Sequence, residues 1–167
     1  SHVNIELEKD QREALLGLSD RGVALLTGGA GSGKTTLAKC VVKALGENSA
    51  TYVAPTGRAA RVLSEKVGEK ATTIHSRFRL DIGMSGVLDC LKIVKDEDMD
   101  KSSVLVIDES SMINLDVFFK MLQHVREDAV IVLIGDHRQL PPIGAGSVFR
   151  DLIHLIKPTR LKFSKRF

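Results

Sequence analysis

A glycine-rich segment around one lysine is the part of this sequence whose residue types and spacing most clearly suit chemistry. Residues 28–35 read Gly-Gly-Ala-Gly-Ser-Gly-Lys-Thr, an apolar run over 23–27 precedes them, and an amphipathic run over 37–45 follows and stops at Gly46. This is the pattern GxxxxGK[ST] in the strand–loop–helix context that gives it meaning. Backbone N–H groups in such a loop wrap a phosphate chain, and the helix N-terminus adds partial positive charge there. The segment therefore predicts a site for a nucleoside triphosphate.

Two side chains at the end of this loop have predicted roles of their own. We assign the Lys34 ammonium to the β- and γ-phosphates and the Thr35 hydroxyl to Mg²⁺. The positions expected to line the nucleotide are Gly28, Gly29, Ala30, Gly31, Ser32, Gly33, Lys34, Thr35 and Thr36. A Gly-rich turn with a chance lysine is the alternative, and the agreement of strand, loop, helix and C-cap argues against it.

A pair of acidic residues follows a second apolar run. Asp108 and Glu109 come directly after residues 104–107, which have the pattern of a strand buried on both faces. Open parallel sheets bind ligands at the carboxyl edge of the strands, where the glycine-rich loop also lies. We therefore expect Asp108 to hold Mg²⁺, usually through water, and Glu109 to orient and deprotonate the attacking water. A solvated acidic turn is the alternative. A base beside the metal ligand favours a hydrolase over many P-loop kinases, whose acceptor is a substrate hydroxyl.

A third apolar run, residues 129–134, leads into the segment 135–142, Gly-Asp-His-Arg-Gln-Leu-Pro-Pro. Within this segment, Gln139 has a neutral side chain that both donates and accepts hydrogen bonds. We expect Gln139 to detect the γ-phosphate or to position the water. A glutamine in a loop means little alone, but this one is the third polar element delivered to the same sheet edge.

The order of the predicted elements indicates an α/β fold. Runs typical of buried strands alternate with amphipathic runs typical of helices, so we expect a mainly parallel sheet with helices on both faces. The expected helices are 7–18, 37–45, 57–67, 115–125 and 147–156, and the expected strands are 23–27, 51–54, 104–107, 129–134 and 161–163. We interpret residues 1–167 as a single domain with a short hairpin or mobile excursion inserted at 81–103.

Composition limits the class of protein. The 167 residues are 43% hydrophobic and 27% charged, with a formal net charge of +3. These values are typical of a soluble globular domain, and the charge permits a polyanionic partner without indicating one. No apolar run approaches the ~20 residues that span a bilayer, and no signal peptide opens the chain. Cys40 and Cys90 have neither metal-ligand nor disulfide spacing. We therefore expect a cytoplasmic protein with no membrane partner.

Five segments, taken in order, also resemble a known family. They read GGAGSGKTT, APTGRAA, TIHSRF, VIDESSM and GDHRQLPPIGAGSVFRDL. Together they resemble the RecD-like branch of superfamily 1 DNA helicases, which includes phage Dda-type and conjugative TraI/TraA-type enzymes, from about Leu7 to the last residues. The resemblance implies a RecA-like P-loop domain that hydrolyses ATP with Mg²⁺, contacts single-stranded DNA and belongs to a parent that translocates 5′→3′. It also implies partners in recombination, conjugation or replication.

The family pattern assigns further residues. Gln11 resembles the residue that bonds the adenine base edge. Residues 54–60 and 73–76 resemble two DNA-contacting motifs, with hydroxyl, backbone N–H, imidazole and arginine groups that suit phosphate. The positions expected to contact DNA are Pro55, Thr56, Gly57, Arg58, Thr73, His75, Ser76 and Arg77. Without the family, Gln11 reads as an exposed helix residue and His75 as a structural histidine. For Phe78, base stacking and core packing both stay open.

The end of the chain both matches the family and departs from it. Arg166 lies where the family has an arginine that reaches the γ-phosphate, and the alternative is a frayed basic terminus. The second RecA-like domain of such motors, with its own arginine finger, is absent from this sequence. We therefore expect the chain to be cut from a longer protein and to turn over slowly by itself. By the same resemblance, residues 81–103 correspond to a small inserted domain that in the family often forms a strand-splitting pin, and here they are short. Two other functions stay open, which are a module that binds nucleotide and single-stranded DNA without hydrolysis, and a P-loop kinase.

Overall fold

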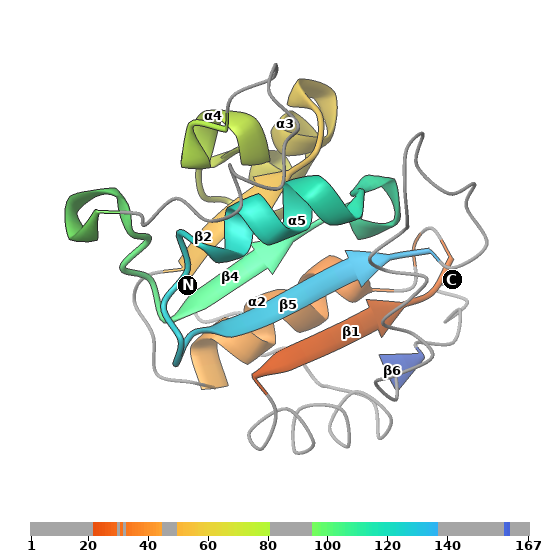
Figure 1. Cartoon of the computed structure of the whole chain (residues 1–167). Coiled ribbons are helices and arrows are strands. Elements are labelled where there is room, and N and C mark those ends of the chain that lie inside the picture. Colours follow the sequence, from red (N-terminus) through yellow and green to blue (C-terminus); the bar gives the residue numbers. More distant parts are fainter. Residues whose placement is uncertain are drawn as a thin grey trace.

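A computed structural model gives the fold of the chain (Figure 1). It describes residues 22–29, 31, 33–44, 50–80, 95–136 and 159–160. The strands are β1 (Val23–Thr27), β2 (Ala50–Ala54), β3 (Ala71–Thr73), β4 (Val104–Ile107), β5 (Val130–Gly135) and β6 (Thr159–Arg160). The α-helices are α2 (Lys34–Ala44), α3 (Gly57–Val67), α4 (Ile74–Phe78) and α5 (Leu115–Leu122), and the 3-10 helices are η2 (Asp96–Asp98) and η3 (Ser110–Met112).

The strands form one sheet in the order β3-β2-β4-β5-β1-β6, and each neighbouring pair is parallel. The central strands β4 and β5 are buried at every position except Val130. A strand that is apolar at each position is stable only where both faces of the sheet are covered. The predicted parallel α/β architecture is therefore confirmed.

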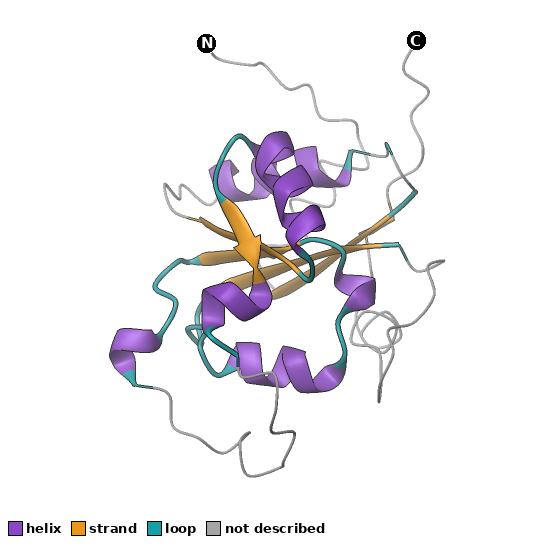
Figure 2. Ribbon diagram, turned by 90° about the horizontal axis from the view of Figure 1, so that it is seen from above, coloured by secondary structure: helices purple, strands orange, loops and turns teal. Residues whose placement is uncertain are grey.

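Alternate residues of each strand point to opposite faces of the sheet, and this alternation divides the core into two layers. On one face, Leu25 of β1 and Leu105 of β4 pack with apolar side chains of α4 and α5. On the other face, Leu26 of β1 and Val106 of β4 pack with those of α2 and α3. Figure 2, seen from above, shows the sheet between helices on both sides.

Helix boundaries follow local side-chain chemistry. α3 begins after Thr56, whose Oγ1 accepts a hydrogen bond from the Ala59 N–H at 3.2 Å. It ends at Gly68, which has φ 73° and donates its N–H to the Ser64 carbonyl. A hydroxyl at the N-cap and a left-handed glycine after the last turn are the usual stop signals of a helix. The predicted helix over 57–67 is confirmed at both ends.

Three features differ from the sequence predictions. β3 and α4 are not predicted, because both are too short to show an apolar repeat, and β3 exists through its pairing with β2. The helix predicted over 115–125 ends at Leu122. Val125 is apolar because it is buried and bridges Asp100, not because it continues the helix. The last described strand is β6, whereas 161–163 lies outside the described residues.

Other predicted elements also fall outside the part of the chain that the structure describes. These are the helices 7–18 and 147–156 and the residues 81–94 of the predicted insertion. The hairpin over 81–103 therefore stays a prediction, and its described end contains η2. None of the described helices combines the length and hydropathy needed to cross a bilayer.

Candidate nucleotide-binding and DNA-contact site

The predicted chemical groups follow strands at one edge of the sheet, since all carboxyl ends of parallel strands meet there. The glycine-rich loop follows β1, Asp108 and Glu109 follow β4, and Asp136 follows β5. These strands are consecutive in the order β4-β5-β1, and the two predicted DNA segments follow β2 and β3, the next strands outward (Figure 1). Residues that are distant in sequence thus share one edge, with the nucleotide groups beside the DNA groups.

Lys34 opens α2, and its ammonium group folds back onto the preceding loop. Nζ donates hydrogen bonds to the carbonyl oxygens of Gly28, at 2.5 Å, and Gly29, at 3.0 Å. Gly31 and Gly33 have φ of 75° and 83°, a conformation that side chains disfavour. Glycine is therefore required at these two positions, and the loop directs the lysine toward the sheet edge.

The charges of three carboxylates act on the Lys34 ammonium group. Burial lowers the pKa of Lys34, and the charges of Asp136, Asp108 and Glu109 oppose that shift by raising it. Asp136 has the largest effect of the three. The acidic residues that follow β4 and β5 therefore act on the same cation.

Asp108 presents a half-buried carboxylate at the end of β4. Its Oδ1 accepts a hydrogen bond from the Glu109 N–H at 2.8 Å. Burial raises the pKa of Asp108, and that hydrogen bond and the charges of Lys66 and Lys34 oppose the shift without reversing it. A divalent cation would relieve a carboxylate in this state, because an opposite charge favours the ionised form. Thr35 lies in the first turn of α2, so the site offers the hard oxygen donors that suit Mg²⁺.

Glu109 adopts a left-handed backbone conformation, with φ 52° and ψ 39°. This conformation costs a residue with a side chain about 1–2 kcal/mol, and such residues cluster at functional sites. Two hydrogen bonds hold the turn. The Met112 N–H donates to the Glu109 carbonyl at 3.0 Å, and Ser110 Oγ donates to the Ile107 carbonyl at 2.8 Å. The chain therefore leaves the extended conformation of β4 at Glu109.

A contact that the sequence analysis does not predict joins this turn to β5. The Ser111 hydroxyl accepts a hydrogen bond from the Asp136 N–H and donates one to the Asp136 carbonyl, each at 3.2 Å. Ser111 is 5% exposed. The sequence contains a pattern that indicates Asp136 as a site residue, because Asp136 follows an apolar strand as Asp108 does. No sequence pattern indicates Ser111, because its hydrogen-bond partner is 25 residues away in the chain.

Each predicted DNA segment contains a threonine that caps a helix. Thr56 Oγ1 caps α3, and Thr73 Oγ1 accepts from the Ser76 N–H at 3.1 Å at the start of α4. Each hydroxyl keeps its own hydrogen for donation. The exposed residues of the predicted DNA set are Thr56, Gly57, Arg58, Ser76 and Arg77, and the partly buried ones are Pro55, Thr73 and His75.

Two neighbouring residues of α4 have structural partners. Arg77 Nη2 lies 3.1 Å from Oδ2 of the buried Asp100, and its guanidinium carbon lies 5.8 Å from the centroid of the Phe78 ring. Phe78 is 3% exposed and belongs to the core. Of the two readings left open for Phe78, core packing is the one that the structure supports. The predicted site residues outside the described part of the chain are Gln11, Ala30, Ser32, Gln139 and Arg166.

Comparisons with known proteins extend this description. The sequence matches the AAA domain family over residues 6–167. The chain belongs to this family. One relative is the ATP-dependent RecD2 DNA helicase of Deinococcus radiodurans, 34% identical over 145 residues, which are 84% of this chain and 19% of that protein. Another is the ATP-dependent DNA helicase Dda of Enterobacteria phage T4, 36% identical over 126 residues, which are 72% of this chain and 28% of that protein.

Among solved structures, the fold of this chain is similar to that of Bacteroides Pif1 bound to single-stranded DNA. That structure matches with a TM-score of 0.66 and 25% identity over 98% of this chain and 43% of that one. These relatives confirm that this AAA-domain chain is a RecD-like superfamily 1 helicase motor domain with the RecA-like α/β fold. The chain spans less than a third of the length of RecD2 or Dda.

Proposed function

We propose that this chain is the ATP-hydrolysing part of a larger DNA helicase, which uses Mg²⁺, contacts single-stranded DNA and moves 5′→3′. The observation that carries the proposal is that the glycine-rich loop with Lys34, the pair Asp108 and Glu109, and Asp136 follow the adjacent strands β1, β4 and β5 at the carboxyl edge of the sheet. Hydrolysis of a phosphate chain needs a cation, a metal ligand and a base close together, and Lys34, Asp108 and Glu109 would supply them at this edge.

The roles follow from position and charge. Lys34 donates to the loop carbonyls of Gly28 and Gly29, and it would turn to the phosphates when they are bound, because a hydrogen bond to an anion is stronger than one to a neutral carbonyl. Thr35 and Asp108 would hold Mg²⁺, which when bound neutralises phosphate charge. Glu109 would take the proton of the attacking water, since it directly follows Asp108 in the turn after β4.

The contact with single-stranded DNA is supported by the helix N-termini of α3 and α4. Both begin at the same sheet edge with a capping hydroxyl, and Arg58 is exposed beside the first cap. Phosphate groups favour such termini because N–H groups and a basic side chain point to one place. The Pif1 relative bound to single-stranded DNA supports the same contact.

Other assignments rest on the family pattern. We propose that Gln11 binds adenine, that Gln139 detects the γ-phosphate and that Arg166 stabilises charge there. Movement 5′→3′, a second RecA-like domain in the parent chain and partners in recombination, conjugation or replication are proposals of the same kind. The relatives RecD2 and Dda are ATP-dependent DNA helicases, which supports ATP and DNA as the two substrates of the parent protein.

The test is hydrolysis of Mg²⁺-ATP by the unaltered chain and by Glu109→Gln, with and without single-stranded oligonucleotide, in single-turnover mode so that slow rates are measurable. Gln keeps the size of the side chain and removes only its basicity. We expect Glu109→Gln to bind nucleotide within about threefold of the unaltered chain and to lose on the order of 10²–10⁴ in hydrolysis rate, the usual contribution of a general base.

Two outcomes would contradict the proposal. Equal rates in both proteins would remove Glu109 from the role of base. Tight nucleotide binding with no hydrolysis by the unaltered chain, even with DNA and the parent protein's remaining domains supplied, would indicate a module that only binds.

A further inference from the structure

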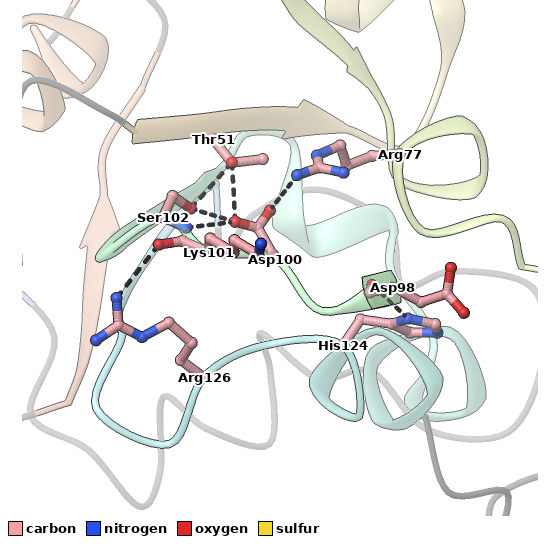
Figure 3. A network of polar contacts seen from close by, with 8 residues as sticks. All are labelled: Thr51, Arg77, Asp98, Asp100, Lys101, Ser102, His124 and Arg126. Atoms are coloured by element: carbon pink, nitrogen blue, oxygen red, sulfur yellow. Dashed lines mark hydrogen bonds and ion pairs between the residues drawn. The ribbon is translucent and has the colours of Figure 1, made fainter. Parts of the chain in front are cut away.

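A buried aspartate lies at the centre of a polar network beside the predicted DNA segment (Figure 3). Asp100 is 2% exposed. Its Oδ1 accepts hydrogen bonds from the Ser102 N–H at 2.8 Å, Ser102 Oγ at 2.5 Å and Thr51 Oγ1 at 3.2 Å. One carboxylate oxygen is therefore fully engaged by groups at the starts of β2 and β4.

The second oxygen of Asp100 depends on Arg77. Arg77 Nη2 lies 3.1 Å from Oδ2 and forms an ion pair with it, although the pair does not have hydrogen-bond geometry. Within the described residues, Oδ2 accepts no hydrogen bond. The side chain of Arg77 is 42% exposed, and it comes from α4, which carries three of the residues predicted to contact DNA.

The backbone around Asp100 is held from the opposite side as well. The Asp100 N–H donates to the His124 carbonyl at 2.6 Å, and Arg126 Nη1 donates to the Lys101 carbonyl at 3.2 Å. The His124 ring lies 5.8 Å from that of Phe78, next to Arg77 in α4. Asp100 therefore cannot follow Arg77 toward the surface without breaking several contacts.

We propose that Asp100 and Arg77 are positioning residues that fix α4, and that Arg77 is not a phosphate ligand. This inference rests on the proposed contact with single-stranded DNA and changes which residues make it. If Arg77 moved to a phosphate, it would leave a buried carboxylate oxygen without its cation, which is among the costliest changes a protein tolerates. A new ion pair between Arg77 and a phosphate in solvent would contribute far less free energy than the lost pair, because water and salt screen it.

The pair also cancels charge. Because Asp100 neutralises Arg77 at short range, Arg77 contributes little to the attraction of a phosphate backbone. The exposed Arg58 has no such partner among the described residues, and it therefore carries more of that attraction. In this arrangement Thr73, His75 and Ser76 are presented to DNA by α4, and the ion pair holds α4 in place.

The test measures binding of the full chain to a fluorescent oligothymidylate as a function of NaCl concentration. Each phosphate contact to a single strand contributes about 0.7 to the slope of log affinity against log salt. Four single variants are compared with the unaltered chain: Arg77→Ala, Asp100→Asn, Arg58→Ala and, as a control cation outside this network, Lys43→Ala, which lies exposed in the last turn of α2. Asp100→Asn keeps the Oδ1 acceptor and the size of the side chain, so it tests the charge even where Arg77→Ala fails to fold.

We expect Arg77→Ala and Asp100→Asn to raise Kd by the same factor at each salt concentration, on the order of ten as for coupling between two sites, with the slope unchanged. We expect Arg58→Ala to reduce the slope by about 0.7 and the control Lys43→Ala to leave Kd within about twofold. A loss of about 0.7 in slope for Arg77→Ala would overturn the inference. So would tighter binding with a steeper slope for Asp100→Asn, which would mean that Asp100 withholds Arg77 from DNA. If the unaltered chain binds no oligonucleotide, the proposed DNA contact itself is refuted, together with this inference.

Discussion

Replacing Ser111 with alanine tests whether the turn that holds Glu109 is fixed by the neighbouring strand. The Ser111 hydroxyl exchanges two hydrogen bonds with the backbone of Asp136, both at 3.2 Å. This hydroxyl links the turn after β4 to the end of β5. It therefore sets the distance between Glu109 and Asp136, whose charges both act on Lys34. Alanine removes both bonds and leaves the rest of the turn in place.

The magnitude follows from the number and quality of these bonds. Each intramolecular hydrogen bond contributes about 0.5–1.5 kcal/mol net, and these two are at the long end of the normal range. We therefore expect Ser111→Ala to lower the free energy of unfolding by about 1–3 kcal/mol. In a chain of this size each kcal/mol corresponds to a Tm decrease of roughly 2–4 °C.

Ser110→Ala is the matched control, since Ser110 is adjacent and also buried, and among the described residues its hydroxyl bonds to the Ile107 carbonyl of its own turn, at 2.8 Å. We expect a loss of about 1 kcal/mol for this control, measured by urea unfolding. At a temperature where all three proteins are folded, Ser111→Ala should hydrolyse ATP more slowly than Ser110→Ala, with nucleotide affinity nearly unchanged. Equal hydrolysis rates in the two variants, or an unaltered unfolding free energy for Ser111→Ala, would refute the role of this link.

Two further predictions concern Asp108 and Thr56. Burial raises the pKa of Asp108, so the folded chain holds that proton more tightly than the unfolded chain. The stability of the protein should then fall as pH rises from the unfolded pKa of ~3.9 through the higher folded one, according to proton linkage. Asp108→Asn should therefore raise Tm at pH 7 relative to the unaltered chain while abolishing hydrolysis, and the Tm difference should shrink toward pH 4. A lower Tm for Asp108→Asn at pH 7 would contradict this. Thr56→Ala should lower the free energy of unfolding by about 1 kcal/mol because α3 loses its N-cap, whereas Thr56→Ser should retain the cap. If the two Thr56 variants are equally stable, the cap contributes nothing.

The parts of the candidate site that the sequence indicates most directly are those whose signal is local. The glycine-rich loop is identifiable because its glycines, lysine and threonine lie within eight positions, and its glycines at 31 and 33 have the positive φ that only this residue adopts freely. Asp108 is identifiable because it ends a run of four buried apolar residues. Each of these features depends on neighbours in the chain, so composition and order suffice to predict it.

The sequence by itself also determined that the sheet is parallel and covered on both faces, because strands that are apolar at each position have no solvent-facing side. Only the tertiary structure decided the order of those strands, the existence of β3 and α4, and the partners of Ser111, Asp100 and Arg77. The reason is physical. Ser111 meets Asp136, 25 positions away, through two hydrogen bonds, and Arg77 meets Asp100 through one ion pair. A lone serine or arginine has the same appearance in a sequence whether it faces solvent, DNA or a buried carboxylate.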